Sequence, residues 1–413
     1  MGEVEKGGDS GALAFAPVGA RQGPPLTPGV PASSEVAEAT TLVAASRDTA
    51  VGTAPLARLR GFHPGWFGAV MGTAIIGVAA SLNPGGTAAL ASPARTLGQV
   101  MVVLAAALAV VLAVPYLGRF LLHPDAALAD LRDPVAGALY GTLPGGILVL
   151  AAAAAAVGPT WFSASTVRDL VVGLDWVGVP LAFAMSVVFA YLLFLRSELV
   201  PETVNGGWFI PPVVNIVVPL VLVPLVPSSS PATARALLLA SYGFFGMGFL
   251  LYLLIVTMLH HRLVLHPLPP AGLAPSLWIG LGPIGVGALA LVKMAAAGQA
   301  VFGSLGPAVE LASKLAATVL WGFGVWWLAA AALLLVHYLR SAPLPYGIGW
   351  WGFTFPLGAY TVATLALAKA WSLSGLDWAG AGLFVLLGLF WLVVAGRTIW
   401  ALRTGEAWRA ARS

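Results

Sequence analysis

The sequence predicts an all-α integral membrane protein with ten membrane-spanning helices. Ten stretches of at least 19 residues contain no Asp, Glu, Lys or Arg, and they lie between residues 61 and 396. A hydrocarbon core about 30 Å thick needs about 20 helical residues, so each stretch is long enough to cross it. Only 9% of all residues are charged and 59% are hydrophobic, whereas about a quarter are charged in a soluble domain. A soluble fold is therefore excluded.

The predicted spans follow one another with short connections. They cover residues 64–82, 97–118, 136–157, 176–195, 208–226, 236–259, 275–295, 311–336, 349–368 and 378–397. Together they predict one transmembrane domain over residues 61–403. Residues 1–58 are rich in Gly, Pro, Ala, Ser and Thr without apolar periodicity, so we expect a disordered tail there. Residues 404–413 are expected to form a second, short tail.

Basic residues gather in one set of the loops between the spans. That set holds ten arginines, whereas the other holds three arginines and Lys314. The positive-inside rule places the richer set, and with it both termini, in the cytoplasm. We therefore expect a multi-pass protein of the cytoplasmic membrane. The net charge of +4 is small and dispersed, so nucleic acid is not an expected partner.

The odd-numbered spans share a Gly or Pro break in their first half or near their middle. Successive breaks lie 72, 68, 71 and 73 residues apart when aligned on Gly72, Pro144, Pro212, Pro283 and Pro356. Proline inside a helix removes a hydrogen bond and bends the axis, and freed backbone at membrane depth needs protein or water around it. The spacing predicts five helical hairpins in a quasi-fivefold ring, with kinked odd helices lining a pore. The alternative is that Gly and Pro are simply common in membrane helices.

Acidic residues and histidines are absent from every predicted span. The motif GLDW occurs at residues 173–176 and 375–378, where Asp175 and Asp377 are expected to cap the next helix. Proton-driven carriers usually hold Asp, Glu or His inside the membrane. This pattern favours a passive route over a proton-coupled cycle.

Two lysines reach membrane depth instead, Lys293 and Lys369. In the orientation above, both lie near the external mouth. A cationic vestibule there would concentrate anions and repel cations. The alternative is that both side chains reach to the lipid headgroups.

Enzyme and metal chemistry find little support in the sequence. His260, His261 and His266 could bind a metal, but without cysteine or a nearby carboxylate we expect a basic loop and no metal or cofactor. Asp125, Asp130 and Asp133 are like half of a diphosphate site of a membrane-embedded transferase. A second aspartate cluster is missing, so we expect no enzyme.

Three segments resemble the tellurite-resistance and C4-dicarboxylate transporter family, which includes plant slow anion channels, yeast malate permeases and fungal sulfite exporters. The segments are PGWFGAVMGTA from Pro64, PSLWIGLGPIGVGALAL from Pro275 and WWGFTFPLGAYTVATLAL from Trp350. The resemblance spans about residues 61–403. It implies ten helices around one pore per subunit, a homotrimer, and passage of small inorganic or organic anions across the lipid bilayer.

The resemblance also implies an aromatic gate on the ninth span. The matching residue is Phe355, next to Pro356, with Phe353 as its neighbour. An apolar ring in a narrow pore blocks ions by steric exclusion and dewetting. We therefore expect an anion channel or facilitator for small anions or C4-dicarboxylates. A coupled dicarboxylate, sulfite or tellurite-resistance transporter is the alternative, and a membrane-embedded transferase fits less well.

Overall fold

The computed structural model describes residues 55–196 and 199–409. This part of the chain is helical and contains ten helices long and apolar enough to cross a membrane, as predicted. Of the expected N-terminal tail, residues 1–54 lie outside the described residues, and Pro55–Arg60 form the short helix α2.

Five of the spans are buried inside the bundle, and we call them the inner helices. In the most apolar 18 residues of these spans, between 72% and 94% of the residues are buried. Their α-helical parts are short because each crosses only the centre of the bundle. They are α3 (Phe67–Ser81), α7 (Thr142–Val157), α9 (Ile210–Leu222), α11 (Leu281–Ala297) and α14 (Thr354–Trp371).

Most inner helices begin as a tighter 3-10 helix. These lead-in segments are η1 (Pro64–Trp66), η4 (Gly206–Phe209), η6 (Ala271–Gly280) and η8 (Ile348–Phe353), and α7 follows the single turn α6 (Ala136–Leu139). Each proline used to align the repeat is the third residue of its α-helix: Pro144, Pro212, Pro283 and Pro356. A missing N–H costs least in a first turn. Gly72 differs, because it is the sixth residue of α3. Bends at these five positions stay a prediction.

The other five spans are long, and we call them the outer helices. They are α4 (Ala88–Leu122), α8 (Ala164–Phe194), α10 (Pro231–Leu265), α13 (Gly306–Ser341) and α15 (Ser374–Thr404). They have 31 to 36 residues, which rise about 46 to 54 Å and so exceed the hydrocarbon core. Only 17% to 22% of their most apolar 18 residues are buried. Their exposed apolar surface suits lipid or another protein chain.

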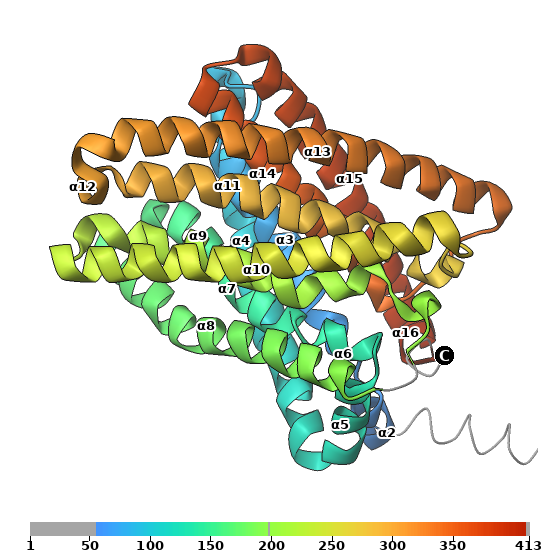
Figure 1. Cartoon of the computed structure of the whole chain (residues 1–413). Helices are drawn as coiled ribbons and strands as arrows, with labels where there is room; N and C mark the ends of the chain where they lie inside the picture. Colours follow the sequence, from blue (N-terminus) through green and yellow to red (C-terminus); the bar gives the residue numbers. More distant parts are fainter. Residues whose placement is uncertain (1–54, 197–198, 410–413) are drawn as a thin grey trace, which may run out of the picture. The chain divides into compact units, whose positions relative to one another are not determined.

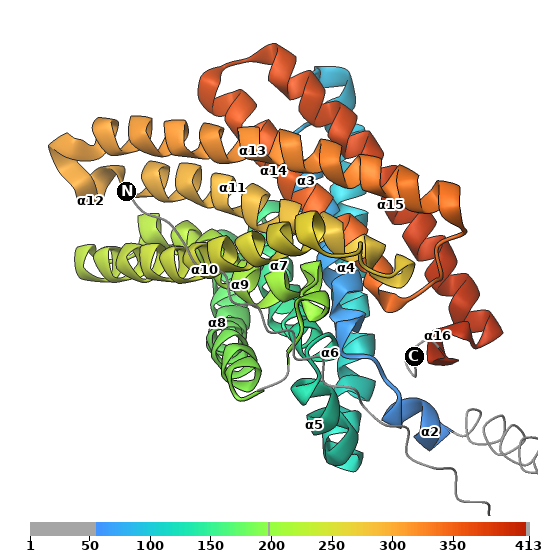
Figure 2. The ribbon, with the colours of Figure 1, turned by 45° about the vertical axis from the view of Figure 1, so that its right-hand side comes forward.

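Each inner helix packs against the outer helix that follows it, which gives five hairpins in chain order. The inner helices also contact one another in a closed series, because α3 packs on α7, α7 on α9, α9 on α11, α11 on α14, and α14 on α3. In both views α10 and α13 lie to either side of α11 (Figures 1 and 2). The described part also contains shorter segments: α5 (Pro124–Arg132), α12 (Gln299–Phe302), α16 (Glu406–Arg409), η2 (Gly158–Thr160), η3 (Pro201–Thr203), η5 (Val223–Ser228) and η7 (Gly303–Leu305).

Glycines allow the inner helices to approach closely. A Cβ atom at Gly72 of α3 would lie 2.0 Å from Oγ1 of Thr354 on α14. At Gly285 of α11 it would lie 2.5 Å from the backbone of Ala359 and Tyr360. In lipid there is no hydrophobic driving force between helices, and small residues promote their association because they allow close van der Waals packing. α14 is therefore held tightly from two sides.

The prediction that acids and histidines stay outside the spans is wrong. The membrane-crossing helices include Asp169, Asp175, Glu310 and Asp377, and also histidines 260, 261 and 337. The expected caps are wrong as well. α8 begins at Ala164 with Ser163 as its N-cap, and Leu373 is the N-cap of α15. A charge-free run marks only the hydrocarbon part of a helix that continues into the headgroup region.

Candidate functional site

The inner helices enclose a cavity at the end where they begin. It has a volume of about 90 Å³ and is lined by residues of all five units. Glycines form much of its wall, among them Gly65, Gly207, Gly282 and Gly352. We call it the entry cavity. Helical elements begin around it, so the positive ends of several helix dipoles lie near this space.

A second, smaller cavity lies further along the same five helices, and we call it the inner cavity. Its volume is about 20 Å³, close to the space of a single water molecule. Each inner helix contributes two apolar residues to its wall: Ile75 and Val78, Val149 and Ala152, Val217 and Leu220, Val286 and Leu289, and Phe355 and Ala359. The two residues are three positions apart in four of these helices and four positions apart in α14.

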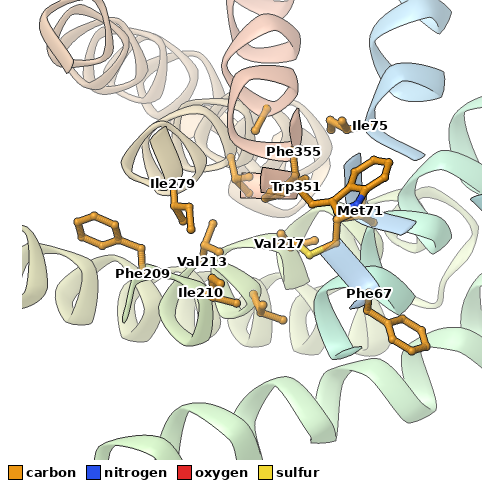
Figure 3. Packing of buried hydrophobic residues seen from close by; sticks show 14 of the residues in the cluster. Phe67, Met71, Ile75, Phe209, Ile210, Val213, Val217, Ile279, Trp351 and Phe355 are labelled. Atoms are coloured by element: carbon orange, nitrogen blue, oxygen red, sulfur yellow. The ribbon is translucent and has the colours of Figure 1, made fainter. Parts of the chain in front are cut away.

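Phe355 stands between the two cavities. Among the described residues, it is the one that borders both. Its side chain is 5% exposed and lies among residues from α3 and α9, including Met71 and Val213 (Figure 3). Gly282 of α11 lies opposite, since a Cβ atom there would be 3.7 Å from Cε1 of Phe355. The Phe355 ring therefore lies in van der Waals reach of a position on α11 that has no side chain.

Phe353 lies elsewhere, although it is only two residues away. Its ring packs against Trp278, Trp350 and Phe390, with ring centroids 5.5 to 6.2 Å apart. It lines neither cavity. This aromatic cluster joins the start of α14 to η6 and α15, which fixes the segment that carries Phe355.

The polar side chains of the entry cavity hold the ends of the inner helices. Thr142 donates to the carbonyl of Pro64 at 3.0 Å. Asn205 Oδ1 accepts from the Gly207 N–H, and Ser276 Oγ accepts from the Gly206 N–H. No acidic or basic residue lines either cavity in the described part of the chain. A permeating ion would meet hydroxyl, amide and backbone groups but no fixed charge.

The two predicted lysines lie at the opposite end, where the inner helices finish. Both side chains are exposed, and they are close enough to interact electrostatically with each other. Lys369 Nζ donates to the carbonyl of Leu82 at 2.6 Å, just past the end of α3, and Asp377 is also near it. Lys369 thus caps a helix C-terminus while adding positive charge to this end.

The loop aspartates make structural contacts. Asp130 binds the buried Arg119 at 2.6 Å, and Asp125 binds Arg60 at 2.6 Å; the latter bond lowers the pKa of Asp125. Asp133 Oδ1 accepts from the N–H groups that open α6. Each carboxylate is therefore engaged within the protein.

His63 lies at the start of the first span, beside this network. Its Nδ1 accepts from the Gly65 N–H at 3.1 Å, which requires a neutral ring nitrogen. Burial lowers the pKa of His63 from 6.5 to about 4, with smaller opposing effects of Asp130 and Arg119. Since Gly65 lines the entry cavity, the neutral imidazole supports its rim.

The predicted histidine cluster does have a carboxylate beside it. His266 Nδ1 lies 2.8 Å from Glu202, and its ring lies 5.5 Å from that of His261. The expectation that no carboxylate is near is wrong, because Glu202 is 64 residues earlier in the sequence. His260 and His261 belong to α10 and not to a loop.

The sequence did not reveal the apolar pairs of the inner cavity. In four of the five units their signal was a pair of apolar residues three positions apart that begins three to five residues after the break, for example Val149 and Ala152 after Pro144. In spans where nearly every residue is apolar, such a pair cannot be distinguished from its apolar neighbours before the helices are assembled.

The arrangement is that of a membrane protein built from five helical hairpins whose inner helices line two cavities. Residues 61–399 match the model of the voltage-dependent anion channel family. The chain belongs to this family of anion transporters.

Several known proteins are similar to this chain, two of them over most of their length. An uncharacterized transporter of Methanocaldococcus jannaschii is 33% identical over 352 residues, which are 85% of this chain and 96% of the relative. A sulfite efflux pump of Trichophyton rubrum is 27% identical over 361 residues, 84% of this chain and 92% of the pump. A malic acid transport protein of Schizosaccharomyces pombe is 24% identical over 232 residues, about half of each chain.

Proposed function

We propose that this protein is an anion channel or facilitator whose pathway runs along the axis of the inner helices. The observation that carries the proposal is the position of Phe355 between two cavities to which all five inner helices contribute. An axial route built from five equivalent faces explains why the hairpin is repeated five times. The quasi-fivefold ring and the bends at the five aligned residues belong to this proposal.

Phe355 acts as the gate in this proposal. Its ring fills the axis and excludes water and ions, while a rotation about χ1 would move it without moving the helix. The tight contacts of Gly72 and Gly285 hold α14 in place, which favours a side-chain movement over a helix movement. Phe353 contributes by fixing the preceding turn and not by blocking the axis.

The walls favour small monovalent anions over C4-dicarboxylates. Two carboxylates are usually bound by arginine or lysine, and arginine pairs with them bidentately, but in the described part of the chain neither cavity presents a basic side chain. Helix ends and hydroxyl groups suffice to attract a single negative charge. Lys293 and Lys369 then form a vestibule that raises the local anion concentration.

A coupled sulfite or malate transporter is the second candidate, favoured by the names of two relatives. For both candidate functions we place the protein in the cytoplasmic membrane with both termini in the cytoplasm, because of the distribution of arginines between the loops. A homotrimer with one pathway in each subunit completes the proposal.

Reconstituted protein in voltage-clamped liposomes tests this function. Reversal potentials across chloride, nitrate, malate and sulfite gradients should follow the anions, with nitrate and chloride permeating better than malate. Nitrate has no titratable group near neutral pH, so a pH gradient alone should not drive it. Uphill nitrate movement under a pH gradient would reject the channel and support a coupled carrier.

A further inference from the structure

Asp175 is a buried carboxylate in a membrane-crossing helix, and it has no partner among the described residues. It is the twelfth of the 31 residues of α8, and its exposed fraction is 6%. Neither carboxylate oxygen has a hydrogen bond within the described part of the chain. Burial without any hydrogen bond or counter-charge is the most costly state for an ionised group. Such a residue in a membrane helix marks a function by default.

The surroundings of Asp175 follow from its place on α8. It belongs to a stripe of buried residues that faces the inner helices, with Val171 before it and Gly178 after it. Gly178 lies against Ile147 and Leu148 of α7, and Val167 lies against Gly158. Asp175 is between these two contacts, opposite the alanine run 151–156 of α7. Alanine side chains leave room for a carboxyl group and offer it no polar contact.

Among the described residues, no charged group faces this carboxyl from the elements packed most closely against α8. Those elements are α7, α9, η2 and α5, and α7, α9 and η2 contain no ionisable residue. The charges of α5 are Asp125, Asp130 and Arg132, and Arg132 lies at the far end of α8, where its carbonyl accepts from Arg196. On α8 itself, Arg168 and Asp169 pair with each other.

We propose that Asp175 is a proton-binding site whose occupancy sets the rate of anion passage. The neutral acid fits an unpartnered pocket, and release of the proton places a negative charge behind α7. The other face of α7 presents Val149 and Ala152 to the inner cavity. The charge would therefore stand one helix away from the pathway.

The expected effect can be scaled from elementary electrostatics. Packed helices are about 10 Å apart. At that separation and with an effective dielectric constant of about 20, the interaction between two charges changes anion occupancy on the order of tenfold. The sign is repulsive. Anion flux should be high while Asp175 is protonated and fall as the proton leaves. This regulation assumes the anion pathway proposed above, but the proton site itself does not.

The test measures nitrate flux in proteoliposomes with equal pH on both sides, from about pH 5.5 to about pH 9. Wild-type flux should fall about tenfold with rising pH, whereas Asp175→Asn should keep the high flux throughout. Asp169→Asn is the matched control, because this exposed carboxylate on the same helix should leave the wild-type pH profile unchanged. High salt should not abolish the effect, since a buried charge is poorly screened.

Infrared difference spectroscopy supplies a readout that does not depend on transport. Wild-type protein should show the carbonyl stretch of a protonated carboxylic acid that disappears at high pH, and the band should be missing from Asp175→Asn. Absence of the band in the wild type at acidic pH, or an unchanged pH profile in Asp175→Asn, overturns the proposal. Replacement of sodium by choline at fixed pH supplies a further check. If this replacement changes the flux of the wild type but not that of Asp175→Asn, the proposal is also overturned, because the result would indicate a metal-cation site. If the wild type carries no anion at any pH, the proposed function fails, and the band alone decides the proton site.

Discussion

Phe355 is the side chain whose removal tests the pathway most directly. Phe355→Ala would join the two cavities that the ring separates, so we expect anion conductance to rise several-fold at unchanged selectivity. Phe353→Ala is the matched control, since it removes an equally buried ring from a cluster beside the axis. Single-channel or liposome flux recordings of both variants provide the measurement. Equal conductance of wild type and Phe355→Ala, with a monodisperse elution profile, would assign the ring to packing.

His63 gives the fold a dependence on pH. Its pKa is lowered to about 4 in the folded protein from 6.5, so the unfolded chain binds the proton more readily. Stability is therefore expected to fall as the pH falls from about 6.5 to about 4, and to change little from this source above that range. Protonation would also break the bond from Gly65 N–H.

His63→Asn keeps an acceptor for Gly65 without titrating in this range. Thermal unfolding of wild type and variant at several pH values should show a smaller loss of stability on acidification in the variant. The same slope in both proteins would mean that other groups govern acid sensitivity.

The lysine pair tests the electrostatics of the opposite end. Replacing Lys293 and Lys369 together by Gln should lower anion flux at low ionic strength and matter little at high ionic strength, because salt screens exposed charges. Glutamine at position 369 can still donate to the Leu82 carbonyl, so the cap of α3 is retained. Lys314→Gln serves as control, since Lys314 pairs with Glu310 on the same outer helix. If the double variant has the same flux as the wild type at low salt, the lysines do not concentrate anions and only contact the headgroups.

Packing between the inner helices makes a different prediction. Gly285→Ala would drive a Cβ atom to 2.5 Å from the backbone of α14, which cannot turn aside. We expect a loss of stability of about 1 to 3 kcal/mol or more, seen as a lower temperature of thermal aggregation in detergent. Gly388→Ala on α15 meets nothing within 4 Å and should be neutral or slightly stabilising. Equal melting of the two variants would contradict the proposed close contact.

The inner spans could be predicted closely and the outer ones could not, for a physical reason. Inner helices cross only the apolar centre, so Gly and Pro breaks and charge-free runs mark them well, as at Pro212 and Pro356. Outer helices continue through the headgroup region, where a charged residue such as Asp169 or Glu310 has no large desolvation cost. The charge-free run therefore ends before the helix does. Asp175 was mistaken for an N-cap because the true start of α8, at Ala164, lies before the charged residues Arg168 and Asp169. The place of Phe355 between two cavities depends on the register of all five inner helices, which no local pattern contains.

Assembly is predicted by the surface of the outer helices. A groove of about 740 Å³ between α4, α7 and α8 is lined almost entirely by apolar side chains, and neighbouring subunits or lipid acyl chains would cover such a surface. Following the family resemblance, we expect three chains of 42.3 kDa each in a nanodisc. Mass photometry of protein reconstituted in disks large enough for a trimer measures this. A population with the mass of one chain per disk would contradict it.

The size of the inner cavity has a consequence for which anions pass fastest. A space of about 20 Å³ walled by Ile, Val, Leu, Ala and Phe holds about one water molecule and offers it no hydrogen bond. An ion that crosses must leave most of its hydration shell behind, and among the described residues no arginine or lysine of that cavity compensates the loss. The permeability order should therefore be that of dehydration cost, with thiocyanate ahead of nitrate, nitrate ahead of chloride, and fluoride last.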